Sequence, residues 1–307
     1  MGIKARRYAD ILAGAPEYVT GRQDEWKAFL TTAARNYKYP YYDQLMIYLQ
    51  RPEATACAEY DFWFDTMHRY VKRGAKGIAL VDNEGDSPKL RYVFDVADTG
   101  ARSNSRPVWL WQMKEEYRNP VMAALERAYG VSRENLSLEA QLEQVAGRLA
   151  ADYWMNYGRQ ISGIVADSFL EEYDEFNIGA AFRKAAQASI AYTLSVRCTE
   201  EAENQFEPED FKDVADFNTR QTAAALGTAV SSISREVFRE IERAIRDYER
   251  TKAQERSQDY EERNNIQTGR GLSASGDRVE RDDGEASGQI RENAQSVSEG
   301  EQSDTVQ

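Results

Sequence analysis

Four cationic side chains fall within a span of eight residues, with no acidic residue between them. They are Arg69, Lys72, Arg73 and Lys76, and the residues around them predict two short strands joined by a tight turn, a β-hairpin. A basic turn of this kind offers a local site for an anion, and the phosphates of a nucleic acid are the first candidates. The alternative is an ordinary turn whose charges are solvated.

Three aromatic residues are candidates to accompany these cations. Trp63 precedes the first cation by six residues, and Tyr39 and Tyr42 belong to a run of four tyrosines between two predicted helices. Aromatic rings stack on unpaired bases with little regard to base identity, so all three are candidate base contacts. The alternative for the tyrosines is packing at the helix junction with the hydroxyl groups directed outward.

The composition argues against most catalytic chemistry. One histidine, His68, and two cysteines, Cys57 and Cys198, cannot build a zinc site, a Ser-His-Asp triad or a disulfide framework. Asp95 and Asp98 could together hold a magnesium ion, but acidic residues at this spacing are more typical of a polar strand end. We therefore expect no enzymatic activity, no cofactor and no metal site.

The formal charge of −13 is unevenly distributed over the 307 residues. Residues 1–120 carry a net charge of +2, residues 121–250 carry −9 and residues 251–307 carry −6. A polyanion should therefore meet the first part of the chain, because the acidic remainder repels DNA at long range. The acidic middle part supports a second hypothesis, a protein-interaction module that engages or inhibits a host DNA-acting enzyme by imitating the charge of DNA. The alternative is that the acidic helices only keep the protein soluble.

Nothing in the sequence indicates a membrane. No apolar run approaches the length of a transmembrane helix, and no apolar segment follows the charged residues at the amino terminus. The low cysteine content is typical of a reducing compartment. We therefore expect a cytoplasmic protein without membrane contacts.

The elements that position these residues follow from the spacing of apolar side chains. A helix is predicted from Asp24, and a second helix ends before Pro52. Strand patterns follow, and from Asn119 onward the pattern is helical. A short buried strand or a turn is expected at 53–58, and strands are expected at 70–71, 78–81 and 90–96. The helices are expected at 120–129, 137–157, 160–175, 177–197 and from Asn218 onward.

The predicted fold class is α+β, with N-terminal helices packed on a small, mostly antiparallel sheet, then an all-α domain and a disordered tail. The expected boundaries are 1–22 for an irregular lead-in, 23–116 for the α+β domain, 117–254 for the acidic helical domain and 255–307 for the tail. The tail has no tryptophan or phenylalanine and few aliphatic residues, so it cannot bury enough apolar surface to offset its chain entropy.

Several separated segments within residues 23–113 resemble, in order and spacing, the N-terminal domain of ArdC/LtrC-type antirestriction proteins. The segments are W-K-A-F-L, Y-Y-D-Q-L-M-I-Y-L-Q-R-P-E-A-T, R-Y-V-K-R-G-A-K-G-I and Y-V-F-D-V-A-D-T. Conjugative plasmids, integrative elements and phages carry this family, and the resemblance implies a single-stranded DNA-binding α+β domain. Asp43 stands where the family commonly has asparagine, so we leave it out of the predicted site.

The resemblance also implies a biological setting. It suggests an accessory protein of a bacterial mobile genetic element, associated with conjugation or antirestriction, that binds single-stranded DNA through the cations and aromatics named above. Residues 114–270 resemble the helical region that follows this domain in large proteins with helicase and methylase domains. A helicase, methylase or relaxase of the same element is therefore the expected protein partner, and the chain resembles a free-standing or truncated front end of such a protein.

Overall fold

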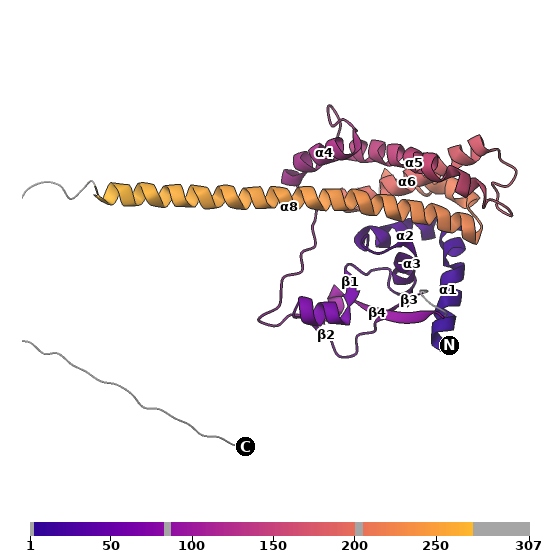
Figure 1. Ribbon diagram of the computed structural model, residues 1–307, viewed down its shortest axis with the longest axis horizontal. Helices are drawn as coiled ribbons and strands as arrows, with labels where there is room; N and C mark the ends of the chain where they lie inside the picture. The colour runs from indigo at the N-terminus through magenta and orange to yellow at the C-terminus, as the bar shows by residue number, and fades with distance from the viewer. Residues whose placement is uncertain (1–2, 83–86, 200–204, 273–307) are drawn as a thin grey trace, which may run out of the picture. The chain divides into compact units, whose positions relative to one another are not determined.

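The computed structural model describes residues 3–82, 87–199 and 205–272 (Figure 1). Residues Met1–Gln254 form one compact unit, and Glu255–Gln307 form a second one. The first unit is α+β, as predicted, with N-terminal helices, a small antiparallel sheet and then a helical region. The predicted fold class is therefore confirmed.

The helices are α1 (Ile3–Thr20), α2 (Gln23–Arg35), α3 (Tyr41–Gln50), α4 (Glu115–Tyr129), α5 (Leu138–Ser162), α6 (Glu175–Cys198) and α8 (Arg220–Leu272). The strands are β1 (Cys57–Glu59), β2 (Tyr70–Val71), β3 (Ile78–Asp82), β4 (Lys89–Asp95) and β5 (Thr99–Gly100). Three short helical segments complete the description: the π-helix η1 (Phe62–Thr66) and the 3-10 helices η2 (Val96–Asp98) and η3 (Pro208–Asp216).

Helix α1 occupies residues that we expected to form an irregular lead-in, so that expectation is wrong. Leu12, Ala15 and Val19 recur at spacings of three and four and are buried. Pro16 lies inside the helix and removes one backbone hydrogen bond. Packing of the apolar stripe against α2 and α3 outweighs that local cost, because tertiary packing supplies most of the stability of a helix.

The three-stranded sheet has the order β1-β4-β3, and both pairs are antiparallel. In this register Cys57 lies opposite Asp95 and Ile78 lies opposite Val93. Helix α3 packs against β3, and the side-chain amide of Gln50 donates to the carbonyl of Ala79 at 2.8 Å and accepts its N–H at 2.9 Å. Gln50 therefore satisfies part of the open edge of β3, which would otherwise be available to another strand.

The N-terminal helices share their core with the helical region. The indole N–H of Trp26 on α2 donates to the hydroxyl of Ser189 on α6 at 2.9 Å. The ring of Tyr41 on α3 lies so close to Gly227 on α8 that a Cβ there would come within 2.2 Å of it. The segments predicted as first and second domains thus meet in a single compact unit.

One predicted helix of the helical region, at 160–175, is wrong, while the other predicted helices are present. Helix α5 ends at Ser162, and turns follow it. Ile161 and Val165 are buried and four residues apart, which is a helical spacing, but Val165 and the buried Leu170 reach the core from these turns. Asp174 then caps α6, since its carboxylate accepts a backbone N–H three residues further on at 2.8 Å.

Helix α8 continues past the predicted start of the tail. Residues 255–272 are helical, in a stretch rich in Glu, Arg and Gln, which favour helix formation. The remainder of the predicted disordered tail, 273–307, lies outside the described residues. No helix in the described ranges, α8 included, has an apolar stretch long enough to cross a bilayer.

Candidate nucleic-acid interface

The segment 69–76 carries the four cations predicted to bind phosphate. It connects two different sheets, because β2 pairs with β5 while β3 pairs with β4, so the predicted hairpin is wrong. A turn does form, in which the N–H of Ala75 donates to the carbonyl of Lys72 at 3.1 Å and Gly74 has a φ of 87°. The N–H of Lys72 itself donates to the carbonyl of Asp98 at 2.8 Å, which extends the contact between β2 and β5. The chain therefore leaves one sheet before it enters the other.

The four cations differ in what holds them. Nε of Arg69 donates to the hydroxyl of Thr99 at 2.8 Å, and the ammonium group of Lys72 donates to a backbone carbonyl of η2 at 2.9 Å. Arg73 and Lys76 are exposed, and neither has a hydrogen-bond or ion-pair partner among the described residues. The segment thus presents two oriented cations and two that are available to a ligand.

Trp63, which we predicted to stack on bases, is 2% exposed, and its indole N–H donates to the carbonyl of Phe94 at 2.9 Å. It anchors η1 to β4. Its neighbours Phe62 and Phe64 are 45% and 42% exposed. Consecutive residues of a helical turn point in different directions, so the three aromatics cannot all face the core. Sequence reasoning selected the ring used for packing and missed the two exposed ones.

Exposed aromatic rings lie beside the cationic segment. The rings of Tyr60 and Phe64 are nearly parallel, with centroids 6.0 Å apart and an interplanar angle of 10°. The guanidinium group of Arg102 lies 5.5 Å from the ring centroid of Phe64 and 5.7 Å from that of Tyr70. We call these four residues and the segment 69–76 the aromatic–basic surface. The spacing of four between Tyr60 and Phe64 was the sequence signal that could have indicated this pair.

A cleft of about 510 Å³ is lined by Trp63 and Tyr39, so the structure brings two of the three predicted stacking residues together. The hydroxyl of Tyr39 donates to the carbonyl of Cys57 at 2.9 Å, and burial raises the pKa of this phenol, which keeps it neutral. Burial also raises the pKa of the Cys57 thiol to about 12. Tyr42 is not part of the lining, and its exposed ring lies 5.4 Å from that of Tyr41.

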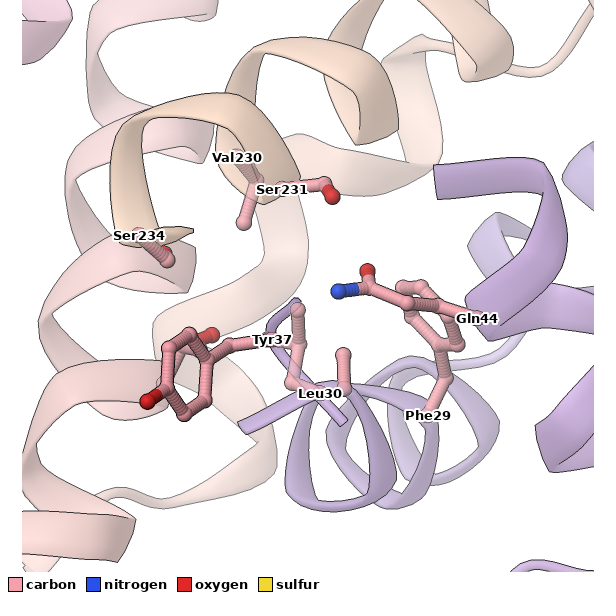
Figure 2. A pocket seen from close by; sticks show the side chains of 9 residues that line it. Phe29, Leu30, Tyr37, Gln44, Val230, Ser231 and Ser234 are labelled. Atoms are coloured by element: carbon pink, nitrogen blue, oxygen red, sulfur yellow. The ribbon is translucent and has the colours of Figure 1, made fainter. Parts of the chain in front are cut away.

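A second, much smaller cavity lies between α2, α3, α6 and α8 (Figure 2). Its volume is about 10 Å³, and its lining includes Gln44, Ser231 and Ser234. The Oε1 atom of Gln44 and the Oγ atom of Ser234 are buried without a hydrogen-bond partner in the described part of the chain. A cavity of this size has room for one water molecule at most, so it is part of the core and not a ligand site.

The two acids considered for magnesium have structural roles. The carboxylate of Asp95 accepts three backbone N–H groups at 2.6–2.9 Å, two of them from the loop before β1. Asp98 forms an ion pair with Arg51 at the end of α3. Within the described ranges no group of three metal-ligating side chains occurs. These acids attach the loop before β1 and the end of α3 to the residues around η2.

Asp43, which we left out of the predicted site, is buried and forms an ion pair with Arg91 on β4. Burial raises the pKa of Asp43, while the charge and hydrogen bond of Arg91 act in the opposite direction. The pair joins α3 to the sheet, so this carboxylate has a packing role.

The aromatic–basic surface and the cleft are neighbours in the fold. Phe62 connects them, because it is exposed on η1, two residues from Phe64, and also lines the cleft. The arrangement combines cations, which can bind phosphates, with exposed rings, which can stack on bases. Comparisons of the chain with family models, with curated proteins and with solved structures find no match.

Proposed function

We propose that the chain binds single-stranded DNA through the aromatic–basic surface, as an accessory protein of a bacterial mobile genetic element. The observation that carries this proposal is the position of Arg102 over the exposed rings of Phe64 and Tyr70. Arg73 and Lys76 follow Tyr70 by three and six residues and have no partner in the described part of the chain. Exposed rings and unpaired cations in one place are unusual on a protein with a formal charge of −13.

Each part of the surface has a distinct role in this proposal. The cations neutralise backbone phosphates and release counterions, which supplies affinity without sequence preference. The rings of Phe64, Tyr60 and Tyr70 stack on bases. Stacking requires bases that are not already paired in a duplex, so single strands are preferred.

The resemblance of residues 23–113 to the N-terminal domain of ArdC/LtrC-type antirestriction proteins supports the same function. It also suggests action in the cytoplasm beside a helicase, methylase or relaxase of the same element. In this proposal the helical region supports the DNA-binding part, since α6 and α8 contribute to its core.

The test compares binding of labelled single-stranded and duplex oligonucleotides by the wild type and by a variant with Arg73→Glu and Lys76→Glu. The wild type should prefer the single strand at low salt, and the variant should lose most of this binding. A matched control reverses two exposed arginines on α4 and α5, Arg127→Glu and Arg159→Glu, which changes the net charge equally. Absence of binding by the wild type at low salt, or equal losses in the variant and its control, would exclude the proposal.

The exposed rings are tested separately. Phe64→Ala should weaken single-strand binding by about 1–3 kcal/mol, the cost of one lost base stack. The control is Phe176→Ala, which removes an exposed phenylalanine 76% accessible at the start of α6. Equal affinities of the two variants would show that the ring of Phe64 does not contact the DNA.

A second candidate function, contact with a host DNA-acting enzyme, has one favourable observation. The acidic turns between α5 and α6 expose Phe169 and Tyr173, and Phe176 follows them. Exposed apolar rings among carboxylates are typical of a surface that docks on a basic protein. Surface substitutions can test this contact without unfolding the protein. Deletion of the acidic residues 121–250 cannot, because it would remove part of the hydrophobic core.

This second candidate predicts inhibition of a duplex-cleaving restriction enzyme by the wild-type chain. Phe169→Ser combined with Phe176→Ser should relieve that inhibition and leave single-strand binding unchanged. If the wild type does not inhibit, or if the double variant inhibits equally well, contact through these rings is excluded.

A further inference from the structure

The cleft of about 510 Å³ has an unusual charge for an acidic protein. Its lining residues, all from the described part of the chain, include four cationic side chains and no carboxylate. The cations are Arg35, Lys38, Arg197 and Arg246, and they come from α2, the loop that follows it, α6 and α8. The cleft therefore has the electrostatic character of an anion site, and none of its lining residues belongs to the aromatic–basic surface.

Arg197 is the least solvated of the four cations. Its guanidinium carbon lies 4.1 Å from the ring centroid of Trp111 and 5.2 Å from that of Tyr37. One terminal nitrogen donates to the carbonyl of Trp111 at 3.4 Å, whereas Nε is buried without a partner in the described part of the chain. Burial lowers the pKa of Arg197, which reflects the cost of holding this charge away from water. Stacking stabilises the faces of the guanidinium group but leaves its N–H edge unsatisfied.

The carboxylate of Glu242 acts on the charge of Arg197, but other groups already use it. Glu242 accepts a hydrogen bond from the hydroxyl of Tyr37 and pairs with Lys38 at 3.2 Å and Arg246 at 2.7 Å. Arg197 forms no ion pair within the described ranges. A charged group held away from water without a counter-ion destabilises the fold, so an anionic ligand at this position would offset part of that cost.

The walls of the cleft suit a planar ring. Trp109 is 37% exposed and lies under the guanidinium group of Arg246, 4.4 Å from its ring centroid, and Phe62 contributes a second exposed ring. The volume of the cleft, about 510 Å³, falls within the range of roughly 300–1,000 Å³ that is common for small-molecule sites. The chemistry that matches both the cations and the rings is that of a planar heterocycle carrying a phosphate.

We propose that this cleft binds a nucleoside monophosphate, with its phosphate at Arg197 and its base against Trp109 or Phe62. The guanidinium group presents paired N–H donors that match phosphate oxygens. The ligand is either a free mononucleotide or the phosphorylated end of a DNA strand, since both present the same groups. The site goes beyond the proposed strand binding and does not depend on it.

Isothermal titration calorimetry on the full chain tests the proposal with deoxyadenosine monophosphate, deoxyadenosine and inorganic phosphate as separate ligands. The monophosphate should bind more tightly than either of its parts. Arg197→Gln should weaken it by about tenfold or more, the size expected for a lost charged hydrogen bond. Trp109→Ala, a change at a partly exposed position, provides a second variant if Arg197→Gln does not fold. Met155→Ala, at a residue 75% exposed on α5, is the control for Trp109→Ala and should bind as the wild type does.

Three results would overturn the proposal: no heat of binding with the monophosphate, equal affinity for deoxyadenosine, or unchanged affinity in both cleft variants. Oligonucleotides with a 5′-phosphate, a 3′-phosphate or no phosphate are then tested as competitors of the monophosphate. This competition shows whether the natural ligand is a free nucleotide or a strand end. Stronger competition by a phosphorylated strand indicates a strand end, and no competition indicates a free nucleotide. The variant with Arg73→Glu and Lys76→Glu should still bind the mononucleotide, which separates this site from the aromatic–basic surface.

Discussion

Replacement of Arg73 and Lys76 by glutamine should change how DNA binding depends on salt. Both side chains are exposed and have no partner among the described residues, so a phosphate can take each one without breaking an existing contact. Each phosphate neutralised on a single strand contributes about −0.7 to the slope of log K against log salt concentration. Four contacts from the segment 69–76 therefore contribute about −2.8, and the double variant should retain about −1.4.

The effect is large enough to measure by fluorescence anisotropy with a labelled single strand. Between about 50 mM and about 200 mM salt, a difference of about 1.4 in slope changes the ratio of wild-type to variant affinity by about sevenfold. The control with Arg127→Gln and Arg159→Gln should keep the wild-type slope. A double variant whose slope equals that of the wild type, whatever its affinity, would show that these two cations do not contact phosphates.

Three further predictions concern the fold. Gly227→Ala should destabilise the chain by about 1–3 kcal/mol in urea unfolding, because the new Cβ would come within 2.2 Å of the Tyr41 ring. The control is Gly14→Ala, whose new Cβ would meet no atom within 4 Å, and it should stabilise α1 by about 0.5–1 kcal/mol. Asp95→Asn should cost about 1.5–3 kcal/mol through weaker acceptance of three backbone N–H groups, and an unchanged urea midpoint would contradict that role. Burial alone would raise the pKa of Glu242, but its hydrogen bonds and cationic neighbours lower this pKa below the ordinary value of 4.5. The contribution of Glu242 to the stability of the fold is therefore present above pH 4.5 and is lost as the pH falls through the folded-state pKa. The difference in unfolding free energy between wild type and Glu242→Gln should therefore shrink on acidification, and a difference independent of pH would refute this.

Most of the helices and the strands of the three-stranded sheet could be predicted from the sequence because their apolar residues recur with a clear period. Helix α1 was not predicted, because the proline inside it, Pro16, is more typical of a helix break. The pairing of β2 could not, since a strand of two residues has no period of its own. Its partner is decided by contacts such as that between Lys72 and Asp98, which are separated by 26 residues. The direction of each ring in Phe62–Phe64 was likewise hidden, because the π-turn of the backbone determines it.

The cleft could not be predicted from the sequence, because its residues are far apart along the chain. Its cations come from four places in the chain, and Arg197 lies 86 residues from the Trp111 ring on which it stacks. No local pattern connects such residues. The absence of a carboxylate from the lining is visible only when the walls are assembled in three dimensions.

The π-helix η1 places the buried Trp63 between the exposed Phe62 and Phe64, so these three positions should tolerate mutation differently. Selection for folding alone should hold Trp63 constant, because its ring is buried and its indole N–H is bonded to β4. The same selection should let the side chains on either side vary, since both face solvent. A saturation library across the codons of Phe62, Trp63 and Phe64 would be sorted once for folding and once for DNA binding. The two sorts would therefore distinguish the residue required for folding from the residues required for binding.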